Sequence, residues 1–452
     1  MAKLDETIEY GGPAGGWGSL RGIVQTAAKE ASGIGALNAL MHQNKPGGFA
    51  CASCAWTKPA HHHPFEFCEN GAKATLWELT SRRCTPEFFA SHTVRELRSW
   101  SDHDLEHQGR LTHPMRYERA SDRYVPCSWE EAFSAIGGTL KALDPESTVF
   151  YASGRASLET AYCYALFARL YGHNNLPDSS NMCHETTSVA LKKVIGSPVG
   201  TVVFDDFSTC DAIFFFGQNT GSNSPRFLHP LQEAVKRGCR IVTFNPVRER
   251  GLERMINPQN PLEMLTGSST EISCQYHQVK AGGDIAVLLG LCKYVFEADD
   301  AERASGGWII DYAFIEEHTH GFEAFEEKVR STSWEAIEAM SGLSRDALFE
   351  AATVYIEASN VIGIYGMGLT QHVHGFENVA SFVNLLLLRG NIGRTGAGIS
   401  PVRGHSNVQG QRTVGIAEKP ELVPLEKLAW LFDFEPPRKK GMNTVAACEG
   451  LL

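Results

Sequence analysis

The sequence predicts an α/β protein in which parallel strands are covered by helices. Apolar runs of strand length recur along the 452-residue chain, helical stretches separate them, and the runs are apolar at nearly every position. Strands that are buried on both faces have this pattern, whereas a half-exposed antiparallel strand alternates apolar and polar residues. We therefore expect Rossmann-like, doubly wound parallel sheets, arranged as two stacked α/β units.

The elements follow in order along the chain. After a glycine-rich start, a helix is expected from Ile23 to His42, followed by a loop between Cys51 and Cys68 that proline residues interrupt. The three adjacent histidines of this loop, His61 to His63, are expected to be solvated. Strands are expected at 149–153, 212–216, 240–244 and 361–365, and helices at 158–170, 187–194, 226–236 and 377–388.

Composition and charge exclude several classes of protein. The chain is 43% hydrophobic and 21% charged, which is typical of a globular enzyme. A net charge of −11 offers no basic surface to a phosphate backbone, so no nucleic-acid partner is expected. No membrane-spanning run and no secretion signal is visible, and we expect a cytoplasmic protein in which most of the twelve cysteines are free thiols.

A first candidate site contains three cysteines. Cys51 and Cys54 form a C-x-x-C pair, and Cys68 follows after thirteen intervening residues. Thiolates at this spacing in a loop can bind one soft metal centre, so zinc, an iron–sulfur cluster and a redox disulfide are all open interpretations.

A second candidate site is the pair Cys183 and His184, which precedes the expected helix 187–194. A cysteine near a helix N-terminus has its thiolate stabilised by the helix dipole, which suits metal ligation or nucleophilic attack. The neighbouring imidazole can exchange protons near neutral pH. Packing of both side chains in the core is the alternative.

Two strand ends carry polar residues suited to a nucleotide. Gly217 and Asn219 follow the strand 212–216, and Asn245 follows the strand 240–244. Ligands of open α/β sheets bind at the carboxyl ends of the strands, where a glycine lets the backbone approach closely. An ordinary turn with a helix cap is the alternative at both places.

The segment 393–410 is the most unusual of the chain. It combines many glycines with two arginines and several amides, and it includes Arg403, Gly404, His405 and Asn407. We do not expect a regular core element here. This composition indicates instead a backbone-rich wall against an anionic ligand that forms many hydrogen bonds.

Taken in this order, Cys183-His184, Gly217-Gln-Asn219 and Pro401-Val-Arg403-Gly404 resemble the prokaryotic molybdopterin oxidoreductases. The chain is similar to formate dehydrogenase alpha subunits, and most similar to the FdhF/YdeP-type branch. Further matching segments are 67–73, 109–114, 128–132 and 367–378, so the resemblance covers nearly the whole chain.

The resemblance implies a fold and a set of roles. The fold would be of the formate dehydrogenase and dimethyl sulfoxide reductase type, preceded by an iron–sulfur region. Cys183 would ligate molybdenum, His184 would relay the substrate proton, and Arg403 would position a carboxylate. Two molybdopterin guanine dinucleotides would be held near Gly217, Asn219, Asn245, Gly404, His405 and Asn407. A [4Fe–4S] cluster would be bound by Cys51, Cys54 and Cys68, with Lys73 between cluster and pterin.

The implied domains are an extension (1–50), the iron–sulfur region (51–110), an α/β domain (111–180 with 406–452) and a Rossmann-like molybdopterin-binding domain (181–405). The expected function is two-electron oxidation or reduction of a small substrate, with a carboxylate as candidate, and transfer of electrons through the cluster to an electron-transfer protein.

The sequence also departs from the family pattern. Lys58 stands where a third clustered cysteine is usual, which leaves Cys84 as a weak candidate for the fourth cluster ligand, and His405 stands where formate dehydrogenases have glutamine. Family chains are longer, so a C-terminal truncation is expected. A truncated chain that binds a cofactor or partner without turnover, and a zinc-stabilised α/β protein, are the alternative hypotheses.

Overall fold

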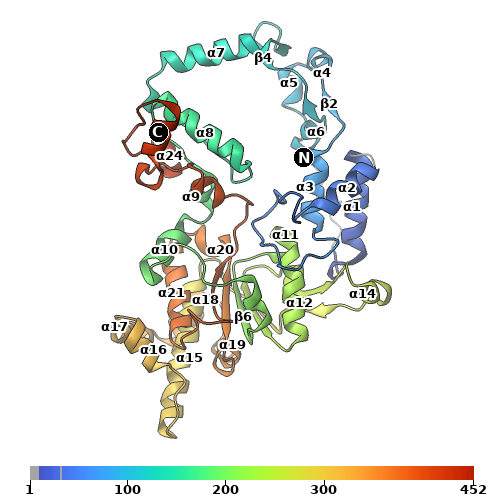
Figure 1. Cartoon of the computed structure of the whole chain (residues 1–452). Helices are drawn as coiled ribbons and strands as arrows, with labels where there is room; N and C mark the ends of the chain where they lie inside the picture. The colour runs from blue at the N-terminus through green and yellow to red at the C-terminus, as the bar shows by residue number, and fades with distance from the viewer. Residues whose placement is uncertain (1–9, 31–32) are drawn as a thin grey trace.

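The computed structural model describes residues 10–30 and 33–452. A five-stranded parallel sheet lies in the lower half of the molecule (Figure 1). Its strand order is β10 (Gln275–Gln278), β7 (Arg240–Asn245), β6 (Ala212–Phe216), β11 (Val361–Tyr365) and β12 (Gly398–Pro401). From β6 the chain first adds strands on one side and later returns to the other side. The direction of winding therefore reverses between β6 and β11, and this is the place where open α/β sheets bind ligands.

The two faces of the sheet bury alternate residues of each strand. Phe214 and Phe216 pack among helices on one face, and Ile213 and Phe215 pack on the other. Since each of these side chains is fully buried, truncation of one phenylalanine to alanine would cost about 3–5 kcal/mol. The first face is covered by α10 (Glu185–Ile195), α15 (Asp284–Ala304), α19 (Arg345–Glu357) and α21 (Gly375–Leu387), and the second by α12 (Leu228–Lys236).

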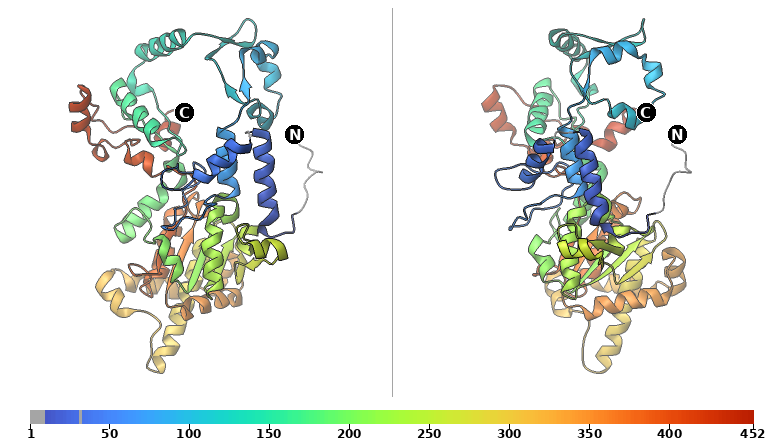
Figure 2. Two further views of the ribbon diagram at one scale, coloured as in Figure 1. Left: turned by 45° about the vertical axis from the view of Figure 1, so that its right-hand side comes forward. Right: turned by 90° about the vertical axis from the view of Figure 1, so that its right-hand side faces the viewer.

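Shorter helices complete this part of the molecule (Figure 2). They are α11 (Thr220–Asn223), α13 (Arg250–Glu253), α14 (Pro261–Thr266), α16 (Tyr312–His318), α17 (Phe322–Ser331), α18 (Trp334–Ser341) and α20 (Met367–Thr370). Of these, α17 and α18 pack against α15, and α20 packs against α10 and α21.

The N-terminal region packs against the sheet-containing part of the chain. A small sheet joins them, in which β1 (Ala14–Gly15) pairs with β8 (Arg254–Ile256) and β8 pairs with β9 (Thr270–Glu271). The helices of this region are α1 (Gly16–Glu30), α2 (Gly33–His42) and α3 (Glu69–Glu78). The loop that contains Cys51 and Cys54 lies between α2 and α3.

From α3 the chain rises through a small segment, crosses the top of Figure 1 in α7 (Trp129–Ala142), and descends through α8 (Leu158–Tyr171) to the sheet. The small segment holds two-stranded pairs, β2 (Arg83–Cys84) with β3 (Arg110–Leu111) and β4 (Met115–Glu118) with β5 (Arg123–Pro126), and α4 (Pro86–Ser91), α5 (Val94–Leu97) and α6 (Asp102–Glu106).

The C-terminal segment returns to α8. It contains α22 (Gly410–Thr413), α23 (Leu425–Phe432) and α24 (Thr444–Glu449). Arg169 of α8 is 1% exposed and donates hydrogen bonds to the carbonyls of Gly415 (2.8 Å) and Ala417 (3.1 Å). These bonds fix the segment that follows the glycine-rich loop against the helix that precedes Cys183.

The α/β class and the parallel sheet are confirmed. The strands predicted at 212–216, 240–244 and 361–365 are β6, β7 and β11, and the helices predicted at 158–170, 187–194, 226–236 and 377–388 correspond to α8, α10, α12 and α21. Within residues 10–30 and 33–452, no helix has both the length and the apolar character needed to cross a membrane.

Two predictions of local structure were wrong, and the bounds of a third differ. The strand expected at 149–153 forms only an isolated bridge between Ala152 and Asp178, because Val149 and Tyr151 are about half exposed and pair with no described strand. The helix expected from Ile23 to His42 is helical at all its described residues, in α1 and α2, but it begins earlier, at Gly16, and residues 31–32 lie outside the described residues. The segment 393–410 does contribute a regular core element, because residues 398–401 pair with β11 as β12.

Candidate active site

The candidate active site is built at the carboxyl ends of β6 and β11, where the winding of the sheet reverses. Gly217 ends β6 with a φ of 57°, and an added Cβ would lie 2.7 Å from Cα of Gly368. A side chain at position 217 would therefore collide with the turn that follows β11. The glycine allows the two strand ends to touch and to form one shared surface.

Cys183 lies on this surface at the end of the short helix α9 (Ser179–Cys183). Its thiol is 8% exposed, and its sulfur lies 3.5 Å from the sulfur of Met367, the first residue of α20. Burial raises the pKa of the Cys183 thiol, while the backbone N–H of Gly404 and the guanidinium of Arg403 act in the opposite direction. Two residues of the glycine-rich segment thus favour the thiolate that a soft metal binds.

His184 is fully buried and its hydrogen bonds define its tautomer. Nε2 lies 3.2 Å from the carbonyl oxygen of Val402, which can only accept, so Nε2 carries the proton. Nδ1 then accepts from the hydroxyl of Thr187 at 2.9 Å, and Thr187 accepts from the hydroxyl of Tyr365 at 3.0 Å. Burial and the charge of Arg403 lower the pKa of His184 to about 3, so the ring is neutral.

Arg403 shares this buried surface with Cys183. The side chain is 7% exposed, and its Nε has no hydrogen-bond partner among the described residues. The preceding residue, Val402, donates its N–H to the carbonyl of Tyr365 at 2.9 Å, which continues the pairing of the two strands into the loop. A guanidinium held in this way is available to an anion at the end of the sheet.

An ionic network joins the segment before Cys183 to the segment after Arg403. Asp178 caps α9 and is fully buried, and Arg412 lies 3.4 Å from it and 3.2 Å from Glu418. Since Glu418 is 1% exposed, all three charges are largely removed from water. Arg412 is thus the shared partner of two buried carboxylates, and loss of one charge would leave another unpaired.

Several polar atoms around this surface are buried and have no hydrogen-bond partner among the described residues. The cost of such an atom is about 1–3 kcal/mol, so an accumulation of them indicates a place built for a polar ligand. They are Gln218 Nε2, Thr220 Oγ1, Arg403 Nε, His405 Nδ1 and both side-chain polar atoms of Gln411. This set suits a cofactor that carries many hydrogen-bonding groups and negative charge.

The amides predicted from the sequence make bonds within the protein. Asn219 caps α11 and donates to Glu249, and Asn245 donates to the carbonyl of Gln218 at 3.0 Å. Asn407 donates to the carbonyl of Ala156 at 2.8 Å. Asn219 therefore has the capping role that the sequence left open as an alternative, and contact of these amides with a nucleotide stays a prediction.

The three cysteines of the first candidate site line one cavity of about 470 Å³. The backbone N–H of Ser53 donates to the sulfur of Cys51 at 3.3 Å, and that of Gly71 donates to the sulfur of Cys68 at 3.4 Å. An added Cβ at Gly71 would lie 2.9 Å from the Cys51 sulfur and 3.7 Å from the Cys68 sulfur. Both sulfurs therefore pack on a bare backbone that a larger residue would fill.

Arg226 anchors the cysteine loop to the sheet-containing part. Its guanidinium, 8% exposed, pairs with Glu66 at 2.6 Å and donates to the carbonyls of Trp56 and Thr57 at 2.9 Å each. The ring of Trp56 stacks on that of Phe227 with 3.8 Å between centroids. The positive charge of Arg226 also opposes the rise that burial causes in the pKa of the Cys51 and Cys68 thiols.

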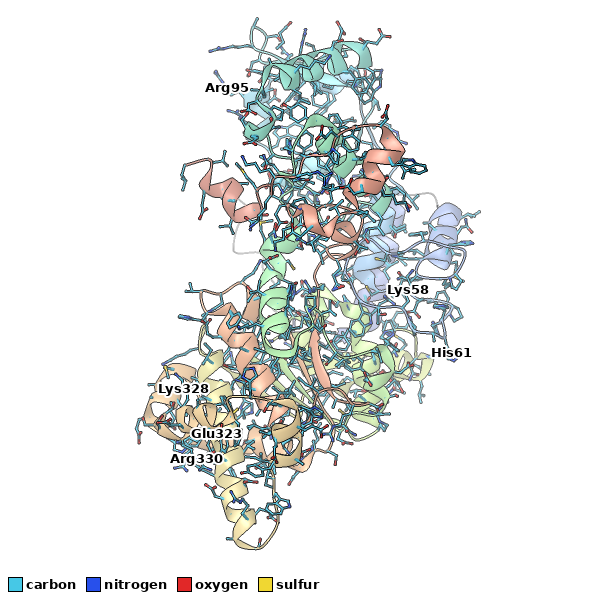
Figure 3. All side chains as sticks on the ribbon, turned by 60° about the vertical axis from the view of Figure 1, so that its left-hand side comes forward. Lys58, His61, Arg95, Glu323, Lys328 and Arg330 are labelled. Atoms are coloured by element: carbon cyan, nitrogen blue, oxygen red, sulfur yellow. The ribbon has the colours of Figure 1, made fainter. Side chains whose placement is uncertain are left out.

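Within the described residues, no three His, Cys, Asp or Glu side chains converge closely enough to hold a single metal ion. The zinc alternative stays untested. Thiols that are spread around a cavity suit a larger cluster better than one ion. Lys58, which stands in place of a third clustered cysteine, lines this cavity. Cys84, the weak candidate for a fourth ligand, lies in β2 and does not line it. Lys73 is ion-paired with Glu69. His61, labelled in Figure 3, and its two neighbours are exposed, as predicted.

The two candidate sites are adjacent. Ser406, three residues after Arg403, lines the cysteine cavity and donates to the carbonyl of Ala52 at 3.4 Å.

The residues that complete each site were not predicted from the sequence. They are Met367, Tyr365, Asp178 and Arg412 at the site of Cys183, and Arg226 at the cysteine cavity. Arg226 stands in the turn before the amphipathic helix α12, where an arginine gives no local signal of its role.

Comparison with known proteins gives a consistent result. The family model described as molybdopterin oxidoreductase matches residues 110–442. Protein YdeP of Escherichia coli (strain K12) is 48% identical over 98% of this chain and 58% of its own length. An uncharacterised oxidoreductase of Mycobacterium tuberculosis is 40% identical over 96% of this chain and 56% of its own length.

More distant matches include subunit alpha of F420-dependent formate dehydrogenase 1 from Methanococcus maripaludis, 29% identical over 72% of this chain and 45% of its own length. Among solved structures, acetylene hydratase from Pelobacter acetylenicus superposes with a TM-score of 0.52 at 19% identity, covering 69% of this chain and 39% of that one. The likeness to acetylene hydratase concerns the fold alone. The chain spans 58% of the length of the YdeP proteins that it matches.

Proposed function

Because the chain belongs to the molybdopterin oxidoreductase family, we propose that it contributes the molybdenum-binding cysteine of an enzyme that oxidises or reduces a small substrate by two electrons. One observation carries the proposal: the Cys183 thiol and the Arg403 guanidinium share a buried surface at the reversal point of the sheet. The likeness to a formate dehydrogenase subunit supports a small carboxylate as the substrate.

We propose bis-molybdopterin guanine dinucleotide as the form of the cofactor. The unpartnered buried atoms of Gln218, Arg403, His405 and Gln411 support it, since a pterin with phosphate groups offers both acceptors and donors. Gly404 would leave room for it, since a Cβ there would meet no atom closer than 3.8 Å, and the backbone at Gly217 would lie beside it. When bound, molybdenum and pterin supply the two-electron chemistry that protein side chains lack.

The protein's own residues would then bind and orient the substrate. Arg403 suits a carboxylate, because its planar guanidinium can donate two parallel hydrogen bonds. His184 fixes the loop through its bond to the Val402 carbonyl, and in this arrangement it holds its proton on Nε2. Burial of Cys183, His184 and Arg403 would keep water away from the reacting atoms.

A [4Fe–4S] cluster is our proposal for the cavity lined by Cys51, Cys54 and Cys68. Its support is the lining of one cavity by all three cysteines, the packing of the Cys51 and Cys68 sulfurs on the bare backbone of Gly71, and the nearby charge of Arg226. Contact between Ser406 and Ala52 supports electron transfer between the two centres, and an electron-transfer protein is the proposed acceptor. A cytoplasmic location is also proposed, because all twelve cysteines are free thiols.

Metal analysis tests the proposal directly. The chain is produced anaerobically in a host that makes the pterin cofactor, and molybdenum and iron are measured by mass spectrometry. We expect molybdenum in the wild type together with iron, and reduction of an artificial dye by a small acid. Protein that is folded but reliably lacks molybdenum would refute the assignment, and molybdenum without turnover would restrict the chain to cofactor binding.

Substitution of one sulfur sharpens the test. Cys183→Ala is expected to abolish dye reduction and leave the iron content unchanged. Cys448→Ala removes an exposed cysteine and serves as the matched control, with activity retained. Substantial activity in Cys183→Ala would contradict its role as the metal ligand.

A further inference from the structure

A second cavity, of about 730 Å³, lies at the opposite edge of the central sheet from the candidate active site. Ser359, which precedes β11, and Arg394, which precedes β12, both line it. It is therefore at the amino ends of the strands whose carboxyl ends carry Tyr365 and Arg403. Its volume is in the range of small-molecule sites.

Three arginines meet at this cavity. Arg303, Arg389 and Arg394 line it, and none of the three forms an ion pair with a carboxylate of residues 10–30 and 33–452. The carboxylate of Asp311, which accepts from the N–H of Phe314 at the start of α16, also lines the cavity, so the lining residues carry three positive charges and one negative charge. A local excess of positive charge on a chain of net charge −11 indicates a place for an anion.

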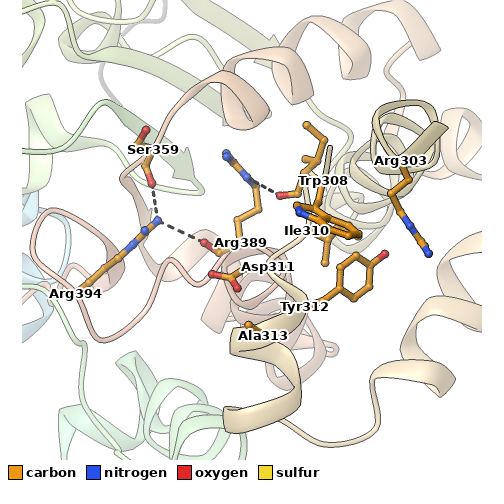
Figure 4. Close-up of a pocket in the computed structure, with 10 residues that line it drawn as sticks. Arg303, Trp308, Ile310, Asp311, Tyr312, Ala313, Ser359, Arg389 and Arg394 are labelled. Carbon is orange, nitrogen blue, oxygen red and sulfur yellow. Dashed lines mark hydrogen bonds between the residues drawn. The ribbon is translucent and has the colours of Figure 1, made fainter. Parts of the chain in front are cut away.

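The two central guanidiniums are held in place before any ligand arrives. Arg389 donates to the carbonyls of Ile309, Tyr355 and Ala358, at 3.2, 2.7 and 2.6 Å. Arg394 donates to the carbonyls of Ser359 and Arg389 (Figure 4). It also donates to the side chain of Asn391 at 2.8 Å. Carbonyl oxygens do not neutralise a guanidinium, so both charges remain available, and little side-chain entropy is left to lose on binding.

An aromatic wall faces these arginines. In Figure 4, Arg389 lies between Arg394 on one side and Trp308, Tyr312 and Arg303 on the other. The indole of Trp308 is 70% exposed, which is unusual for so large an apolar side chain. The loop that carries it is rigid, because the buried carboxylate of Asp299 accepts from the N–H groups of Ile309 and Ile310 and from the hydroxyl of Tyr312.

We propose that this cavity binds a nucleoside phosphate, with the base on Trp308 and the phosphate on Arg389 and Arg394. A planar ring stacks on an exposed indole, and guanidiniums bind phosphate oxygens through charge-assisted hydrogen bonds. The proposal is independent of the proposed function, and the position of the cavity makes the ligand an effector rather than the substrate.

Titration calorimetry of the full 452-residue chain with ADP, AMP and inorganic phosphate tests the proposal. We expect saturable binding of ADP and AMP, and weaker binding of inorganic phosphate. Arg394→Gln and Trp308→Ala should each weaken ADP binding about tenfold. Arg303→Gln is a second charge variant, at an exposed side chain that lies over the ring of Tyr312, 5.5 Å from its centroid.

The matched controls are Arg95→Gln and Trp430→Ala. Both side chains are exposed and lie outside the cavity, and Arg95 is at the far end of the molecule (Figure 3). They should leave ADP binding unchanged. Absence of ADP and AMP binding overturns the proposal. Binding that survives the Arg394, Arg303 and Trp308 variants also overturns it, because the nucleotide then occupies another place, such as the cofactor surface at Gly217. Inorganic phosphate that binds as tightly as ADP would refute the role of the base.

Discussion

Asp178 and Arg412 form a buried ion pair, with 3.4 Å between Oδ2 and Nη1, that ties the helix ending at Cys183 to the segment following Arg403. Asp178 also accepts hydrogen bonds from the hydroxyl of Ser180 and the N–H of Asn181, at 2.7 and 3.0 Å. The placement of the Cys183 sulfur therefore depends on a carboxylate five positions earlier in the chain.

The first prediction concerns this carboxylate. Asp178→Asn keeps the size of the side chain but leaves Arg412 with Glu418 as its single carboxylate partner. We expect a loss of about 1–3 kcal/mol in the free energy of unfolding, measured by urea denaturation, and a changed rate of Cys183 alkylation in the folded protein. Glu78→Gln is the control, because it removes the same charge from the exposed pair with Arg110 and should cost at most about 1 kcal/mol. Equal effects of the two variants would refute a special role for Asp178.

The second prediction uses glycine as a probe of the cysteine cavity. Gly71→Ala would bring a Cβ within 2.9 Å of the Cys51 sulfur, so the thiols must move apart. We expect the iron content per chain to fall by more than half. Gly138→Ala, in the interior of α7, meets nothing within 4 Å and should instead stabilise the protein by about 0.5–1 kcal/mol, with iron content unchanged. Full iron loading of Gly71→Ala would show that the thiols do not rest on this backbone when the cluster is bound.

The parts of the fold that could be predicted are those in which local pattern and burial agree. β6, β7 and β11 are buried on both faces, so their sequences are mostly apolar and their bounds could be predicted almost to the residue. β12 escaped prediction because its sequence is Gly-Ile-Ser-Pro, and it pairs only because it lies beside β11. Its strand structure comes from tertiary contact, which composition does not reveal.

In the candidate site, the residues of the short motifs could be predicted from the sequence, but their partners could not. Cys183, His184 and Arg403 follow from short motifs, and the structure brings them together on one surface. The partners that hold them could not be predicted. Asp178 and Arg412 are separated by more than 200 residues, and nothing in either local sequence indicates an ion pair. Pairings of this kind follow from the path of the chain in space.

The third prediction concerns the anchor of the cysteine loop. Arg226→Gln removes one partner of a pair with side-chain exposures of 8% and 12%, and leaves Glu66 charged and buried. We expect a loss of about 3–5 kcal/mol in the free energy of unfolding, together with a lower iron content because the carbonyls of Trp56 and Thr57 lose their donor. Arg110→Gln breaks an exposed pair and should cost at most about 1 kcal/mol. An Arg226→Gln protein as stable as Arg110→Gln would mean that the loop is held by the stacking of Trp56 alone.

The last prediction concerns pH and rests on His229, a half-buried residue of α12 that lines an apolar cavity beside Cys68. Burial lowers its pKa to about 4, and the charges that face it are those of Glu66, Arg226, His63 and Glu263. An unfolded histidine titrates near 6.5. As the pH falls below about 6.5, the unfolded chain therefore binds a proton that the folded chain refuses, and stability decreases until the pH reaches about 4.

We expect this residue to contribute a loss on the order of 2 kcal/mol between these two pH values, measured as the pH dependence of the free energy of unfolding. In His229→Gln the slope across this window should be reduced, because the substituted side chain does not titrate. His320→Gln replaces an exposed histidine and should leave the slope as in the wild type. A slope that is unchanged in His229→Gln would mean that water reaches the ring and that the cavity beside Cys68 is not dry.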